Sequence, residues 1–167
     1  MIWAQEAEPE TSANEAETAG SSMTIPSSEA PIDISADRNN YDLRAGVVEY
    51  IEDVYIERGP MQIHADRAIF RETEGEIAEI ELFGAPVEWQ DQLEDGTIVS
   101  GEANNIFFDV IANVVTLTGN SVIRHEQGEF TGDRLVYDLT NENLSGSSEG
   151  DNRVRARIEP GALPDDN

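Results

Sequence analysis

Apolar and polar residues alternate along most of this chain, which is the pattern of a β-strand with one buried face. Between residues 31 and 159 this alternation returns in many short windows separated by Gly, Asn and other turn residues. Helical spacing fits none of these windows well. We therefore expect an all-β domain of antiparallel strands, arranged as a sandwich, barrel or roll.

One face of each predicted strand supplies the candidate interior. Met61 shares the alternation of Ile63 and Ala65, and the segment 47–56 is rich in strand formers but does not show which face is buried. Phe107 is expected on the face opposite Phe108. The inward positions that we select are Ile32, Ile34, Ala36, Ile63, Ala65, Ile80, Leu82, Val87, Trp89, Ile106, Phe108, Val115, Leu117, Leu135 and Tyr137.

A short phrase, apolar-x-small-Asp-Arg, recurs along the chain. It is clearest in Ile63–Arg67 and recurs in Ile34–Arg38 and Phe130–Arg134. A degenerate copy is found in Val99–Ala103. Counted from the acidic position, the copies are 29, 36 and 31 residues apart, a period typical of stacked supersecondary units. A second shared element is found in Gly84–Val87 and Gly119–Val122. Each unit is expected to run strand, turn, strand, with a bend before the next strand.

The composition of the chain excludes several classes of function. The formal net charge is −25, and all ten basic residues are Arg. This excess of negative charge argues against nucleic acid as a partner and against peripheral binding to an anionic membrane surface. There is no cysteine, so a disulfide framework and a thiolate metal site are excluded. No apolar run of about 18 residues that could span a bilayer is present.

Three segments follow from composition. Residues 1–30 are acidic and poor in large apolar side chains, so we expect a disordered tail, with Met1–Gln5 either a signal-peptide remnant or an addition to the natural chain. Residues 31–159 form the predicted domain. Residues 160–167, rich in Pro and Asp, are expected to form a disordered C-terminal tail.

Candidate catalytic groups do not converge. His64 and His125 lie in different repeats, and an acid–base reading of the Asp-Arg pairs is weakened because they recur with the period of the fold. We expect these Asp side chains to cap turns and the Arg side chains to cover the outer surface. Phosphate loops, calcium loops and nucleophile elbows are absent from the sequence. We expect no enzyme activity, no cofactor and no metal.

The last predicted strand carries Arg153, Arg155 and Arg157 on one face, against Val154, Ala156 and Ile158. One interpretation is a charged edge that blocks aggregation. The other is a surface that meets an acidic partner or a lipid phosphate. The expected first strand, Pro31–Arg38, and last strand, Arg153–Pro160, leave edges that could accept another module. The residues selected for these assembly edges are Ile32, Ile34, Arg153, Val154, Arg155, Ala156, Arg157 and Ile158.

The Ala-Asp-Arg phrase, the two Gly-x-x-Val elements and the run Gly132–Asp138 together resemble the OstA-like family over nearly all of 31–159. The third phrase departs from this pattern by lacking both Asp and Arg. The resemblance implies a β-jellyroll of two facing sheets around an apolar groove. It also implies a periplasmic, non-catalytic module that carries lipopolysaccharide from the inner to the outer membrane. Its partners would be the lipid A part of lipopolysaccharide, an inner-membrane LptC-type module, an outer-membrane LptD-type module and further copies of itself, stacked head to tail.

The inward residues would then line a lipid-binding groove. Burial of an acyl chain gains about 0.8 kcal/mol per methylene, so a chain of roughly twelve carbons approaches 10 kcal/mol before binding costs. Three alternatives stay open at this point. They are a structural or adhesive β-repeat protein with a closed core, another module of the same pathway of LptC or LptD type, and a sugar-processing β-roll enzyme.

Overall fold

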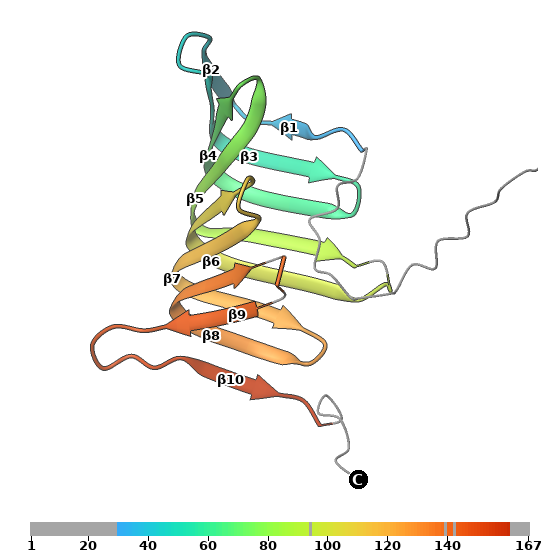
Figure 1. Cartoon of the computed structure of the whole chain (residues 1–167), viewed down its shortest axis with the longest axis vertical. Coiled ribbons are helices and arrows are strands. Elements are labelled where there is room, and N and C mark those ends of the chain that lie inside the picture. Colours follow the sequence, from blue (N-terminus) through green and yellow to red (C-terminus); the bar gives the residue numbers. More distant parts are fainter. Residues whose placement is uncertain (1–29, 94, 139, 142, 161–167) are drawn as a thin grey trace, which may run out of the picture.

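A computed structural model describes residues 30–93, 95–138, 140–141 and 143–160 (Figure 1). Apart from Ala30 and Pro160, the tails predicted for 1–30 and 160–167 lie outside these residues. In chain order the strands are β1 (Asp33–Ser35), β2 (Arg38–Asp42), β3 (Val47–Arg58), β4 (Met61–Thr73), β5 (Glu76–Gln92), β6 (Ile98–Asp109), β7 (Val114–His125), β8 (Gly128–Asp138), β9 (Asn143–Ser147) and β10 (Arg155–Ile158). The prediction of an all-β antiparallel fold is confirmed.

All ten strands belong to one antiparallel sheet. Strands β3 to β8 pair in sequence order, each with the next along the chain. At one end of the sheet both β1 and β2 pair with β3, and at the other end both β9 and β10 pair with β8. Each end therefore carries two short edge strands.

A line of irregularities crosses the middle of this sheet, and we call it the bend line. The register shifts once within each of the pairs β3·β4, β5·β6, β6·β7 and β7·β8, and the main shift in β4·β5 falls on the same line. The sheet folds at this line, so that the long strands turn back on themselves (Figure 1). The residues at the bend line are Glu52–Asp53, Ala65–Asp66, Gly84–Pro86, Ala103–Asn104, Gly119–Asn120 and Asp133.

The bend line divides the sheet into two facing halves. The predicted pair of facing sheets is therefore one continuous sheet bent over. Layer A contains 38–42, 47–51, 67–73, 76–83, 105–109, 114–118, 134–138 and 143–147. Layer B contains 33–35, 54–58, 61–65, 87–92, 98–103, 121–125, 128–132 and 155–158.

Local chemistry explains why the chain bends here. Glu52, Asp53, Gly119 and Asn120 all have positive φ angles, which extended strands do not use and which Gly and Asn tolerate best. At Gly84 a Cβ atom would lie 2.7 Å from the backbone nitrogen of Val87. These residues interrupt the ladder at matching positions in neighbouring strands, so the whole sheet folds along one line.

The recurring phrase marks the bend line, but the acidic position predicted for the copy Val99–Ala103 does not lie on it. Glu102 is an ordinary strand residue that pairs with Glu88 and Val122. The residue at the bend in β6 is Asn104, preceded by Ala103 as Asp66 is preceded by Ala65. Measured at Asp37, Asp66, Asn104 and Asp133, the steps are 29, 38 and 29 residues. Each step spans two strands, because the chain crosses the bend line once in each direction.

The predicted end strands are shorter than expected. The segment predicted as one strand over Pro31–Arg38 divides into β1 in layer B and the start of β2 in layer A. The division falls at Ala36–Asp37, where the backbone N–H of Asp37 donates to the carbonyl of Glu52 at 2.9 Å. At the other end the strand covers only Arg155–Ile158, so Arg153 and Val154 precede β10.

The core lies between the layers. One cluster of buried residues joins Ile106 and Leu117 of layer A to Val87 and Ile123 of layer B. The segment whose buried face was ambiguous contributes Val48 and Tyr50 from layer A, together with Val54 and Ile56 from layer B.

Candidate functional site

The interior contains a cavity of about 90 Å³ between the two layers. The residues that form its wall are aliphatic, aromatic or Met, except for one Asp. Layer A contributes Ile80, Leu82, Ile106, Phe108, Val115, Leu117 and Tyr137, and layer B contributes Met61, Ile63, Trp89, Asp91 and Ile123, with Leu93 directly after β5. An apolar cavity of this kind binds apolar groups, and Asp91 supplies the one carboxyl group among the described residues of its wall.

Nine of the predicted interior residues lie in the cavity wall, namely Ile63, Ile80, Leu82, Trp89, Ile106, Phe108, Val115, Leu117 and Tyr137. The other six pack elsewhere in the core. Ala65, Val87 and Leu135 are buried in the central cluster, while Ile32, Ile34 and Ala36 pack against it from the β1 end. The cavity thus occupies the middle of the sheet, away from its first strand.

Four wall residues were absent from the predicted set. Met61 and Ile123 follow the same alternation as their neighbours, so the signal was present in the sequence. Asp91 continues the series Val87, Trp89 by two residues, and its parity alone places it inward. Leu93 lies beyond the end of β5, where alternation no longer applies.

Asp91 is the chemically distinctive residue of this wall. Its side chain is inward and the residue is only 3% exposed. The carboxyl Oδ1 accepts the backbone N–H of Gln92 at 2.8 Å. Burial raises the pKa of the Asp91 carboxyl group, and the hydrogen bond from Gln92 opposes this more weakly. No group of three or more metal-ligating side chains is found within the described ranges.

The cavity is small for a lipid. Its volume is below the ~150 Å³ of an engineered core cavity that admits benzene. Most of the space between the layers is therefore filled by side chains, and a long acyl chain requires the layers to separate. The bend line joins the layers along one side, and the hairpin turns lie along the opposite side.

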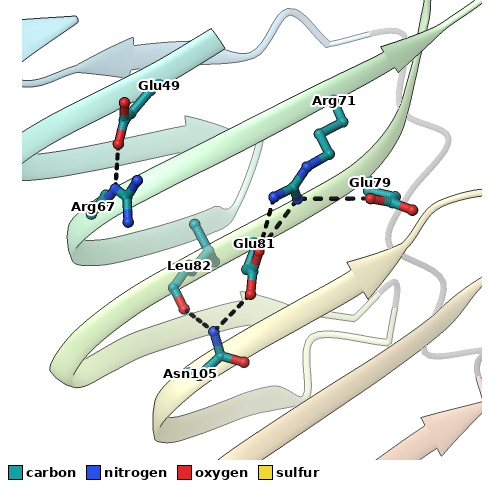
Figure 2. Close-up of polar contacts among 7 residues, drawn as sticks. All are labelled: Glu49, Arg67, Arg71, Glu79, Glu81, Leu82 and Asn105. Atoms are coloured by element: carbon teal, nitrogen blue, oxygen red, sulfur yellow. Dashed lines mark hydrogen bonds and ion pairs between the residues drawn. The ribbon is translucent and has the colours of Figure 1, made fainter. Parts of the chain in front are cut away.

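The outer surface is polar and held by ion pairs. In layer A, Arg67 pairs with Glu49, and Arg71 lies 3.7 Å from Glu79 and 3.3 Å from Glu81 (Figure 2). Asn105 donates to the carbonyl of Leu82 at 3.2 Å (Figure 2). These side chains are partly exposed, so each pair contributes about 1 kcal/mol or less.

His64 and two of the Asp-Arg phrases make contacts that hold the fold together. His64 lies on the outer face, with its ring centroid 4.7 Å from that of Tyr55. The carboxylate of Asp133 accepts the backbone N–H of Glu149 at 2.8 Å, and Arg38 pairs with Glu52 at 2.7 Å. The Asp133 carboxylate thus holds a segment 16 residues away, which differs from the local turn cap that the sequence predicts.

The ends of the sheet carry opposite charges on the outer face of layer B. In β10, Arg155 and Arg157 pair with Thr131 and Glu129, which places them on that outer face, while Ile158 is 51% exposed. In β1, Asp33 and Ser35 flank the inward Ile34.

Residues 33–143 match the family described as LptA/(LptD N-terminal domain) LPS transport protein. The chain belongs to this family. The resemblance inferred from the recurring phrase is confirmed, and the relatives point to its LptA type. The described part of the chain has no helix suited by length and apolarity to crossing a membrane.

Curated relatives and a solved structure agree with this family. The chain is 29% identical to the lipopolysaccharide export system protein LptA of Haemophilus influenzae, over 80% of this chain and 79% of that protein. It is 26% identical to LptA of Escherichia coli K12, over 82% and 75%. The crystal structure of LptH from Pseudomonas aeruginosa, described as a periplasmic component of lipopolysaccharide transport, shares the fold with a TM-score of 0.71 at 21% identity, over 79% of this chain and 97% of that one.

Proposed function

We propose that this chain is a periplasmic, non-catalytic bridge module that carries lipopolysaccharide from the inner to the outer membrane. The observation that carries the proposal is the family match over 33–143, combined with an apolar cavity between the two layers that the family segment forms. The chain binds the lipid A part through its acyl chains, and the saccharide stays in water. Family membership favours this function over a closed-core adhesive repeat and over a sugar-processing enzyme.

The acyl chains enter between the layers at the cavity. Burial of a chain of roughly twelve carbons offers about 10 kcal/mol before binding costs, which is enough to offset separation of side chains that meet across the interior. The acidic outer surface repels a phosphorylated head group, but this repulsion is screened over about 8 Å at physiological salt. Apolar burial therefore dominates.

Modules stack head to tail through the short edge strands. Because successive strands alternate in direction, β9 of one copy runs antiparallel to β2 of the next, and β10 runs antiparallel to β1. Both layers can therefore continue from copy to copy with unbroken antiparallel pairing. This contact is heterologous and need not close, so it can build a bridge. LptC-type and LptD-type modules would occupy the two ends of the stack.

Charge and apolar surface favour the same contact. Addition of β10 to β1 brings Arg155 and Arg157 toward Asp33 on the outer face. With Arg157 opposite Asp33 in this antiparallel pair, Ile158 would lie opposite Ile32 on the inner face, and its exposed side chain would be buried. The basic edge thus serves for assembly, in preference to a device that only blocks aggregation.

Site-specific photo-crosslinking to lipopolysaccharide tests the bridge function. A photoreactive phenylalanine analogue is placed at Phe108, which lines the cavity, and separately at Phe107. Phe107 is a matched control, because it is the neighbouring residue of the same type on the outer face, where it pairs with Glu81 and Thr116. We expect lipid capture from position 108 and from a probe at Ile63, but not from position 107.

Competition identifies the part of the ligand that is bound. Lipid A should abolish capture at Phe108, and free saccharide should not. Equal capture from both faces, or none from a folded protein, would leave the interior as a closed core and would contradict the proposal.

A further inference from the structure

Asp91 is a carboxyl group without a full set of partners in the wall of an apolar cavity. The residue is 3% exposed, and its neighbours in the wall include Trp89, Leu93 and Met61. The only hydrogen bond that its carboxyl group makes with the described residues is the one from the backbone N–H of Gln92, to Oδ1. Transfer of a carboxylate from water to a mostly apolar wall costs free energy, so packing alone does not explain Asp at this position.

The position of Asp91 along β5 is equally informative. The strand bends at Gly84–Pro86 and ends at Gln92, so Asp91 lies close to the strand end, at the side of the interior opposite the bend line. Val99 is its partner on β6. An acyl chain that occupies the cavity reaches water at this side. The polar end of such a ligand would therefore pass Asp91.

The charged groups around Asp91 do not satisfy it in the described structure. Register places Arg58 on β3 and His125 on β7 in the same row of layer B, each two strands away from β5. Strands are spaced about 4.8 Å apart, so these backbones lie roughly 10 Å away. Within the described residues neither side chain forms a hydrogen bond or ion pair with Asp91, whose carboxyl accepts only from Gln92. Asp95, in the turn after β5, carries the same negative charge as Asp91.

We propose that Asp91 is a specificity-determining residue of the interior, whose carboxyl oxygen accepts a hydrogen bond from a neutral donor near the polar end of an acyl chain. The donor is a hydroxyl or an amide N–H of the bound amphiphile. A phosphate or carboxylate would be repelled at this point. The inference rests on the proposed function, since it requires that an acyl chain enters the cavity.

A pair of neutral ligands tests this inference directly. Methyl myristate and its β-hydroxy derivative differ by one hydroxyl close to the ester end. Their affinities are measured by displacement of a fluorescent fatty-acyl probe from the full chain. A hydrogen bond to a charged group favours the hydroxylated ester, and we expect a roughly tenfold preference in the wild-type protein.

Three variants separate the possible roles of Asp91. Asp91→Leu removes the acceptor and should reduce the preference to about one, without weaker binding of the plain ester. Asp91→Asn keeps an acceptor oxygen without the charge and should retain part of the preference. Glu88→Gln removes one charge from the outer face of the same strand and should leave the preference unchanged.

The outcomes distinguish this inference from the proposed function. A preference that survives in Asp91→Leu, or that is absent from the wild-type protein while plain ester still binds, overturns the role of Asp91 and leaves the bridge function intact. If neither ester displaces the probe from any protein, acyl binding itself fails, and both proposals fall.

Discussion

At the scale of single residues, the buried carboxyl group of Asp91 makes stability depend on pH in an unusual direction. Its pKa is raised by burial above the ordinary value of 3.8. At pH values between the ordinary pKa, which applies to the unfolded chain, and the raised pKa of the folded protein, the folded state holds a proton that the unfolded state has released. This group therefore makes stability fall as pH rises. Asp91→Asn removes the effect. We expect the variant and the wild type to be about equally stable near pH 3, and the variant to be the more stable near pH 7.

Urea unfolding at a series of pH values measures this difference. Asp95 and Asp138 act in the opposite sense, because hydrogen bonds lower their pKa values, and their contribution is lost as pH falls. Subtraction of the two unfolding curves isolates Asp91, since both proteins share the other carboxylates. A constant difference across the range would show that Asp91 titrates as an ordinary surface group.

A second prediction at this scale compares one substitution at two places in the interior. Val115 lines the cavity, whereas Val87 is 0% exposed and packs away from it. Val115→Phe should fill the cavity, with stability unchanged within about 1 kcal/mol and lipid capture from Phe108 lost. Val87→Phe overpacks a filled region and should cost about 1–3 kcal/mol. The measurements are urea unfolding and photo-crosslinking, and equal destabilisation of the two variants would show that no usable cavity exists.

At the scale of elements, the bend line decides how far apart the layers stand. At Gly119 the φ angle is +80°, and an added Cβ atom would lie 2.8 Å from the side chain of Asn104 on the neighbouring strand. Gly75, in a hairpin turn, has a similar φ of +85° and open space around it. Substitution of each glycine by Ala therefore distinguishes the cost of backbone strain, which both positions share, from the cost of a steric clash, which only Gly119 has.

Gly119→Ala should therefore be the more damaging of two otherwise similar substitutions. Backbone strain alone costs about 1–2 kcal/mol, and Gly75→Ala should show only this loss. Gly119→Ala must also displace Asn104, so we expect at least about 1 kcal/mol more destabilisation, together with weaker binding of the acyl probe. Equal losses in both variants would mean that the bend tolerates movement of Asn104.

The elements also show how much of the fold follows from sequence. Alternation with a period of two predicts inward residues well, because a strand that is buried on one face has no other pattern available. Across the bend the alternation changes phase, so the sequence predicts Glu102 as the acidic position of the third phrase, whereas Asn104 occupies the bend. Asp91 has the parity of the inward set, but its charge suggests an outward residue. The cavity itself depends on how side chains from distant strands meet, which no local pattern records.

At the scale of the whole molecule, the two ends of the sheet determine whether copies assemble. The described end strands are short and exposed, and their outer-face charges are opposite: Arg155 and Arg157 on β10, and Asp33 on β1. An interface of this kind adds two edge strands to two others. Its register depends on those charges, and its affinity depends on the contact of Ile158 with Ile32. Assembly should weaken with increasing salt as the charges are screened.

Charge exchange provides the test of this assembly. Arg155→Glu together with Arg157→Glu should weaken self-association by about tenfold or more, because like charges then face each other across the contact. Asp33→Arg in the same chain should restore it in part. Arg134→Glu, a reversal on β8 within layer A, is the control and should leave association unchanged. Sedimentation velocity at increasing protein concentration measures each step, and unaltered association in the doubly reversed protein would place the interface elsewhere on the molecule.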